Sequence, residues 1–290
     1  LANGTQLVLS RAVGSGIAAS LSKAFWAGLF INLGIATVFW FLLTFFEQPL
    51  IQALTDDNAL QLEISRYLDI SKYLVIFTAL TQVIIALFNA LGRTKVPFKG
   101  YLIELPINAV LSYVLIHGFS TFEGIGVQGA ALGSIIAITI RLLYLALCVH
   151  LSSTLSLKLS AQKSEFITNV RRHFIEIFPV AANVTMLLIG ATIYQLLYSQ
   201  LNINAYVAIT LVMPWIRAGS QFITAWAHSS AITISQAIGS KKMDDLAKNV
   251  DTRIDVAVGV SIICAVLFAG LSVVIGGTYS DLVPSTYQAL

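Results

Sequence analysis

Glu104, Asn108 and Ser112 are the residues whose types and spacing best suit the binding of a small cation. They recur every four residues, so a helix would carry all three on one face. Pro106 lies between them and removes a backbone donor, which leaves a carbonyl free. A carboxylate, neighbouring side-chain oxygens and free carbonyls together suit sodium or a proton. In the alternative interpretation, Glu104 only reaches the edge of its apolar segment and pairs with Lys99.

Arg217 and Gln221 form a second candidate site, because they follow Pro214 at helical spacing in another apolar segment. The proline predicts a break in the helix at that point. An arginine buried there can bind an anionic group, or it can balance the charge of Glu104. A structural ion pair and a backbone cap are equally open interpretations of Arg217.

Five further residues within the apolar segments also have functional interpretations. Gln82 and Asn89 share one helical face and either line a cavity or bond another helix. Tyr194 is a third candidate for the wall of a cavity, since its ring can contact flat compounds, although packing explains it as well. His228 either titrates or forms a hydrogen bond within the packing. Arg141 has no partner that the sequence identifies.

The composition indicates that helices crossing a membrane position these residues. Hydrophobic residues form 57% of the 290 positions, charged residues only 11%, and the mean hydropathy is +0.83. Crossing a hydrocarbon core of about 30 Å takes on the order of 20 apolar residues per helix. Runs of that length cover 24–46, 73–91, 100–118, 124–150, 177–201, 203–239 and 256–277, and a shorter apolar stretch covers 1–13. Because membrane strands are about ten residues long with alternating polarity, we predict an all-α polytopic membrane protein.

Charges in the connecting loops predict the orientation of these helices. Lysine and arginine concentrate near 11–23, 92–99, 151–175 and 240–253, whereas the other loops are mainly acidic. By the positive-inside rule, the four basic loops face the cytoplasm. We also expect the mixed apolar and basic stretch 151–175 to lie partly on the membrane surface.

An internal repeat relates the two ends of the chain. Residues 10–23 read SRAVGSGIAASLSK and residues 235–248 read SQAIGSKKMDDLAK, and the identities include Ser10 with Ser235 and Gly14 with Gly239. We interpret these four residues as structural. Six apolar segments separate the copies, and an even number returns the chain to the same side, which indicates parallel repeats.

The repeat also predicts the domain organisation. Doubling its offset gives two six-helix lobes with about 450 residues in all, so we expect this chain to be truncated at both ends. The amino-terminal lobe would cover 1–150, an inter-lobe connector 151–175, and the first three helices of the carboxy-terminal lobe 176–290.

Four segments, in the same order, resemble the multidrug and toxic compound extrusion (MATE) family. They read LVLSRAVGSG at 7–16, ALGRTKVPF at 90–98, NAVLSYVLIHG followed by GIGVQGAALGS across 108–134, and ITISQAIGS at 232–240. That family has twelve helices in two lobes around a substrate cavity, and the likeness runs from the end of its second helix to the start of its tenth. The resemblance implies an antiporter that exports organic, often cationic, drugs or toxins in exchange for sodium ions or protons by alternating access.

The resemblance also bears on the candidate residues. Asn108 and Ser112 would align with an asparagine and an aspartate of the amino-lobe cation site, with serine here in place of the aspartate. In another branch of the family, a glutamate follows a proline of the seventh helix by eight residues. Counting from Pro179 reaches Leu187 instead. Coupling to sodium or protons is therefore implied by the family alone.

No cofactor, nucleic-acid partner, obligate protein partner or enzymatic activity is expected. The G-x-G-x-x-G run at 124–129 follows an apolar helix rather than a strand, so we interpret its glycines as allowing close helix packing. Small organic substrates and the lipid bilayer are the expected partners, and a bacterial inner membrane is the expected location. A lipid-linked oligosaccharide or polysaccharide flippase of the same superfamily is the alternative function. It would need a strongly basic cavity, for which only Arg141 and Arg217 are candidates. A third class, an intramembrane enzyme or receptor, finds no support in catalytic motifs.

Overall fold

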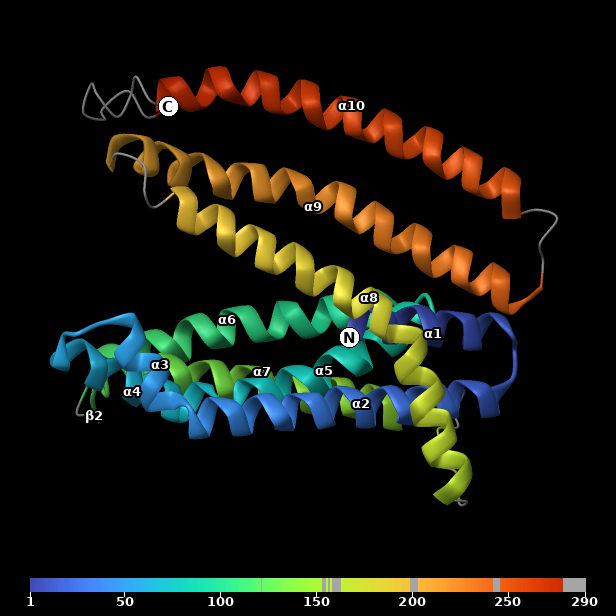
Figure 1. Ribbon diagram of the computed structural model, residues 1–290, viewed down its shortest axis with the longest axis horizontal. Helices are drawn as coiled ribbons and strands as arrows, with labels where there is room; N and C mark the ends of the chain where they lie inside the picture. The colour runs from blue at the N-terminus through green and yellow to red at the C-terminus, as the bar shows by residue number, and fades with distance from the viewer. Residues whose placement is uncertain are drawn as a thin grey trace. The chain divides into compact units, whose positions relative to one another are not determined.

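The computed structural model is almost entirely α-helical (Figure 1), which confirms the all-α polytopic fold expected from the composition. It describes residues 1–120, 122–152, 155, 157, 163–198, 203–241 and 246–278. The chain divides into two compact units, Leu1–Phe178 and Pro179–Leu290. Lys158 of the predicted connector and Lys242 of the last basic loop lie outside the described residues.

The first unit contains most of the helices. They are α1 (Ala2–Gly14), α2 (Ala18–Phe45), α3 (Glu47–Leu54), α4 (Asn58–Ser71), α5 (Leu74–Ala90), α6 (Lys95–His117), α7 (Val127–His150) and the start of α8 (Lys163–Tyr198). Between α6 and α7, β1 (Gly118–Phe119) and β2 (Phe122–Glu123) form a short antiparallel hairpin. The second unit holds the rest of α8, α9 (Ile203–Gly239) and α10 (Leu246–Thr278).

Several of these helices are long and apolar enough to cross a membrane. Within the described residues they are Ala18–Phe45, Asn58–Ala90, Lys95–His117, Val127–His150 and Ser164–Tyr198. These segments contain or overlap the first five of the seven predicted apolar runs. The other two predicted runs begin within α9 and α10, so the helix order expected from hydropathy is confirmed.

The core of the first unit lies where α1, α2 and α5 meet. Leu9 and Leu87 are fully buried there, and Phe25 packs beside them with 6% of its surface exposed. A second cluster joins α5 to α7 through Phe88 and Leu145. Many large apolar side chains remain exposed on the outward faces, as expected of helices whose solvent is lipid rather than water.

Glycines allow α6 and α7 to pack closely. A Cβ atom added at Gly129 would lie 2.5 Å from the backbone carbonyl carbon of Leu115, which is closer than real Cβ atoms approach. One added at Gly133 would lie 2.9 Å from the backbone nitrogen of Ser112. The predicted role of the 124–129 glycines in helix packing is therefore confirmed at Gly129. This close approach brings polar groups of the two helices within hydrogen-bonding reach.

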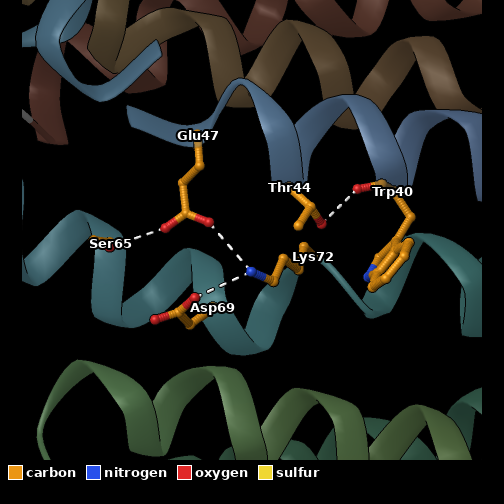
Figure 2. Close-up of polar contacts among 6 residues, drawn as sticks. All are labelled: Trp40, Thr44, Glu47, Ser65, Asp69 and Lys72. Carbon is orange, nitrogen blue, oxygen red and sulfur yellow. Dashed lines mark hydrogen bonds and ion pairs between the residues drawn. The ribbon is translucent and has the colours of Figure 1, made fainter. Parts of the chain in front are cut away.

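A polar network joins α3 to α4 and to Lys72, which directly follows α4 (Figure 2), in a stretch that the sequence suggested was only a loop. The Glu47 carboxylate accepts a hydrogen bond from Ser65 Oγ at 2.9 Å and forms an ion pair with Lys72 Nζ at 3.2 Å. Lys72 also pairs with Asp69 at 3.1 Å. Helix α4 begins where the Asp57 side chain accepts a hydrogen bond from the backbone of its first turn. The charges that the sequence suggested belonged to a loop thus hold two short helices together.

The two copies of the sequence repeat end their helices in the same way. Helix α1 ends at Gly14 and α9 ends at the matching Gly239. The next residue is a serine in each copy. Ser15 Oγ donates to the Ala12 carbonyl at 2.7 Å, and Ser240 Oγ donates to the Ala237 carbonyl at 3.0 Å.

The residue that follows each serine turns the chain with a positive φ. It is Gly16 (φ +70°) in the first copy and Lys241 (φ +58°) in the second. The left-handed region suits glycine and strains a lysine. The two turns therefore match in backbone conformation even where their side chains differ.

Candidate functional site

Glu104 of α6 forms an ion pair with Arg141 of α7. The distance from the carboxylate oxygen to the guanidinium nitrogen is 2.5 Å, and the two side chains are 14% and 4% exposed. The Arg141 guanidinium also lies over the Tyr101 ring, 4.3 Å from its centroid. The missing side chain of Gly100 leaves room for Arg141, since a Cβ there would lie 3.2 Å from its Cγ.

The alternative interpretation, in which Glu104 pairs with Lys99, is wrong, because the carboxylate pairs with Arg141. Five residues separate the two along α6, so their side chains leave the helix in different directions. Lys99 is exposed, whereas Glu104 faces α7. The other suggested partner, Arg217, belongs to the second unit.

Asn108 lies at the centre of a smaller polar cluster, one helical turn after Glu104. Its side-chain oxygen accepts hydrogen bonds from Ser112 Oγ at 2.9 Å and from Ser134 Oγ of α7 at 3.4 Å. Ser134 also donates to the backbone carbonyl of Ala130. Three uncharged oxygens therefore gather between α6 and α7.

Ser134 was missed by sequence reasoning, although the sequence contains a signal for it. It precedes Arg141 by seven residues, which is two helical turns, so both lie on the same face of α7. That face meets the face of α6 that carries Glu104 and Asn108. The two polar faces run side by side through the close packing that the glycines allow.

Asn89 bonds another helix, which was one of its two predicted roles. Its side-chain nitrogen donates to Gln6 Oε1 of α1 at 3.2 Å, and Gln6 is 8% exposed. The fully buried Ser10 donates to the backbone carbonyl of Gln6, so the repeat serine supports the same contact. Gln82 is half-buried on α5.

The start of α8 packs against α1 and α2 within the first unit. Ion pairs join Glu165 to Lys23 at 2.5 Å and Glu176 to Arg11 at 3.3 Å. Between these pairs, His173 is 4% exposed and its Nε2 has no hydrogen-bond partner among the described residues. No sequence signal singles out this histidine, because its burial depends on helices that are distant in the chain.

The second unit contains a cavity of about 550 Å³ between α8 and α9. Tyr194 lines it as the sequence suggested for a cavity, together with Tyr198, Tyr206 and Arg217. The rings of Tyr194 and Tyr198 stack with their centroids 6.3 Å apart. Gln221, the other residue of the second candidate site, is exposed on α9 outside the residues that line this cavity.

Comparison with known proteins finds a family model and two relatives that are similar to this chain. The MatE family model matches residues 1–114. A probable multidrug resistance protein NorM from Streptococcus pneumoniae is 23% identical over 254 residues, which cover 82% of this chain and 53% of that protein. A second NorM protein, from another strain of the species, is 26% identical over 130 residues, covering 45% of this chain and 29% of that protein. Over residues 1–114 the chain therefore resembles the MATE family.

Solved structures of MATE transporters share the fold of this chain. The eukaryotic MATE transporter AtDTX14 matches with a TM-score of 0.82 at 16% identity, over 99% of this chain and 63% of that one. The MATE transporter ClbM in complex with Rb⁺ matches with a TM-score of 0.70 at 21% identity, over 99% of this chain and 64% of that one. The chain therefore spans about half the length of one curated relative and under two thirds of these solved MATE chains.

The chain has uncharged groups at the two positions where the family resemblance led us to look for carboxylates. Ser112 hydrogen-bonds to Asn108, and Leu187 is a 69% exposed apolar residue on α8. Among the described residues, no three His, Cys, Asp or Glu side chains come together as a metal-binding group. The ion-binding chemistry that these residues offer is therefore that of oxygen atoms suited to a monovalent cation, together with the paired carboxylate of Glu104.

Proposed function

We propose that the protein is a secondary active exporter of organic compounds, driven by the entry of sodium ions or protons. The resemblance to the MATE family over residues 1–114 carries this proposal, and it is supported by the two relatives named as multidrug resistance proteins. In the proposed cycle, two lobes alternate between states that open to opposite sides of the membrane. Cation entry favours the state from which the substrate leaves.

The Asn108 cluster is the proposed site for a sodium ion. Alkali-metal binding by a transporter of this fold is supported by the Rb⁺ complex of ClbM. In this chain Asn108, Ser112 and Ser134 offer three neutral oxygens within one hydrogen-bonded group. Sodium is a hard cation that prefers oxygen ligands, and helix α6 contains Pro106 in the same turn.

Glu104 is the proposed site for a proton, provided that Arg141 finds another partner when the carboxylate is neutralised. A proton that binds the carboxylate removes the negative charge that holds Arg141. The guanidinium would then have to find another partner, so protonation of Glu104 requires α6 and α7 to rearrange. A carboxylate whose neutralisation releases a buried arginine suits a conformational cycle.

The lipid-linked glycan flippase finds less support in the arrangement of basic residues. Such a function needs several free cationic groups in one cavity to hold a pyrophosphate. Of the two arginines that the sequence offers within apolar segments, Arg141 is already paired with Glu104. Arg217 stands in a cavity whose other walls are aromatic, apolar or uncharged.

Transport assays on the intact protein in proteoliposomes test the proposal. An imposed sodium or proton gradient should drive the movement of ethidium. Asn108→Ala and Ser112→Ala should abolish sodium-driven movement, whereas Glu104→Gln should abolish proton-driven movement. Thr139→Ala is the matched control, because it removes a hydroxyl from α7 that bonds only its own helix. If neither gradient moves ethidium or another organic dye, the exporter proposal is contradicted.

A further inference from the structure

The cavity in the second unit has the wrong charge for an organic cation. Its polar lining residues include Arg217 and the phenols of Tyr194, Tyr198 and Tyr206, and none of the carboxylates that the structure describes lines it. The carboxylates among the described residues of this unit are Asp251 and Asp255 of α10, neither of which lines the cavity. A cation that entered would meet a positive charge with no negative charge beside it.

Arg217 forms no ion pair with any residue in the described part of the chain. It lies within the apolar run of α9, three residues after Pro214. A guanidinium in such a segment is costly unless it reaches a partner, and intramembrane charges of this kind mark ligand sites. Arg141, by contrast, has its carboxylate within 2.5 Å.

The rest of the lining suits a flat ring. Tyr194 and Tyr198 present two nearly parallel rings, with planes that differ by 25°. Tyr206 and Met213 contribute from α9, and the volume of about 550 Å³ falls in the range of sites that hold drug-sized ligands. Aromatic side chains bind planar ligands by offset stacking, while arginine binds carboxylates through two parallel hydrogen bonds.

We propose that this cavity binds planar aromatic compounds that carry an acidic group. Arg217 holds the carboxylate or a comparable oxyanion, and the tyrosines hold the ring. The inference rests on the proposed export function, because it assigns a substrate class to the same protein. It replaces the organic cations implied by the family resemblance with aromatic anions at this site.

Binding of two fluorescent probes to the intact protein in detergent tests the inference. Acridine carboxylate and aminoacridine share one ring system and differ in the sign of their charge. The wild-type protein should bind the carboxylate more tightly than the amine. Arg217→Gln should lower the affinity for the acridine carboxylate by about 10- to 100-fold, the range expected for the loss of a hydrogen bond to a charged group. The affinity for aminoacridine should not fall. Arg217→Lys should retain part of the affinity, because it keeps the charge and loses the paired geometry.

Matched variants separate the site from general effects of charge and surface. Arg171→Gln removes an exposed positive charge from the first unit and should leave the binding of both probes unchanged. Tyr194→Leu should lower the affinity for both probes, because it removes a ring on which they stack. Tyr113→Leu removes a comparably exposed ring from α6 and should leave both affinities unchanged.

Three outcomes would decide the matter. Tighter binding of the amine, or carboxylate binding that survives both Arg217→Gln and Tyr194→Leu, would overturn the inference. Gradient-driven ethidium export without Arg217-dependent binding of the carboxylate would support the export function and contradict the proposed binding site. Arg217-dependent binding without gradient-driven movement of either probe would support the binding site and contradict the export function.

Discussion

At the residue scale, the contacts of Glu104 define what this carboxylate can do. An isolated carboxylate in an apolar segment suggests a group that couples transport to an ion. Its ion pair with a 4% exposed arginine means that the negative charge is also needed to keep Arg141 in place. Any role in proton coupling is therefore tied to the stability of the α6–α7 pair.

The first prediction concerns this pair. Glu104→Gln should lower the free energy of unfolding by about 3–5 kcal/mol, because Arg141 is left buried with no counter-charge. The double variant Glu104→Gln with Arg141→Met should lose much less than the sum of the two single losses, because neither charge remains. Chemical denaturation in mixed micelles measures all four proteins of the cycle.

The control for that prediction is an exposed ion pair of similar geometry. Glu63 and Arg66 lie 2.9 Å apart on α4, with side chains 46% and 51% exposed. Glu63→Gln should cost about 0–1 kcal/mol, because water replaces the lost partner. If Glu63→Gln and Glu104→Gln lower the free energy of unfolding equally, the buried ion pair stabilises the protein no more than the exposed one does.

The second prediction concerns the twin turns. Lys241→Gly should raise the free energy of unfolding by about 1 kcal/mol, because lysine is strained at φ +58°. Gly16→Ala should lower it by a similar amount, through its φ of +70° alone, since a Cβ there would meet no atom within 4 Å. Lys99→Gly in helix α6 is the control and should be destabilising by about 0.5–1 kcal/mol. A lower free energy of unfolding for Lys241→Gly would contradict the claim that this turn strains lysine.

At the element scale, the packing of α6 against α7 positions every polar contact of the first candidate site. The helices approach closely because Gly129 and Gly133 face the backbone of α6. Ser134 then reaches Asn108, and Arg141 reaches Glu104. The glycines therefore contribute to the site although none of them bears a functional group.

The third prediction tests this packing. Gly129→Ala should lower the free energy of unfolding by about 1–3 kcal/mol, because its Cβ must push the backbone of Leu115 away. Gly34→Ala in α2 is the control, since a Cβ there would meet nothing within 4 Å. It should raise stability by about 0.5–1 kcal/mol through helix propensity, in the same denaturation assay. Two equal effects would mean that the α6–α7 contact tolerates a methyl group.

How much the sequence predicts differs between helix faces and helix pairs. The spacing of Glu104, Asn108 and Ser112 predicted one helical face, and their contacts run within α6 or toward α7. The same spacing did not identify Arg141 as a partner. Periodicity specifies the direction in which a side chain leaves its helix, measured around the helix axis. Its partner on another helix depends also on the relative position of the two helices along their axes.

The short helices α3 and α4 were missed for a different physical reason. Their charged residues suggested a loop, because hydropathy distinguishes membrane spans from everything else. The contacts among Glu47, Ser65 and Lys72 stabilise these helices, and these residues are 18 and 25 positions apart. The Asp57 cap was the one local signal for α4.

At the scale of the whole molecule, the orientation in the membrane is a proposal that charge alone supports. The basic loops near 11–23, 92–99, 151–175 and 240–253 would all face the cytoplasm. Helices α1 and α9 end at the matching Gly14 and Gly239, and the predicted parallel repeat would put these two turns on the same side.

The fourth prediction tests this orientation by cysteine labelling. In a variant without Cys148 and Cys264, Lys95→Cys and Lys241→Cys should react with a membrane-impermeant maleimide only in inverted vesicles. Asp56→Cys, between α3 and α4, should react in intact cells. All three residues are exposed, so access depends on sidedness rather than on burial. Labelling of Lys95→Cys and Asp56→Cys from one side would contradict the predicted topology.

The ion pair between α6 and α7 has a consequence for synthesis. Helix α6 is the least apolar of the five segments that suit a membrane span, and it leaves the ribosome before α7 exists. A single unpaired charge raises the cost of inserting a helix by up to about 3 kcal/mol. Glu104 finds its counter-charge only when Arg141 has been made, 37 residues later. We therefore expect the translocon to release α6 and α7 into the lipid together, as one helical hairpin.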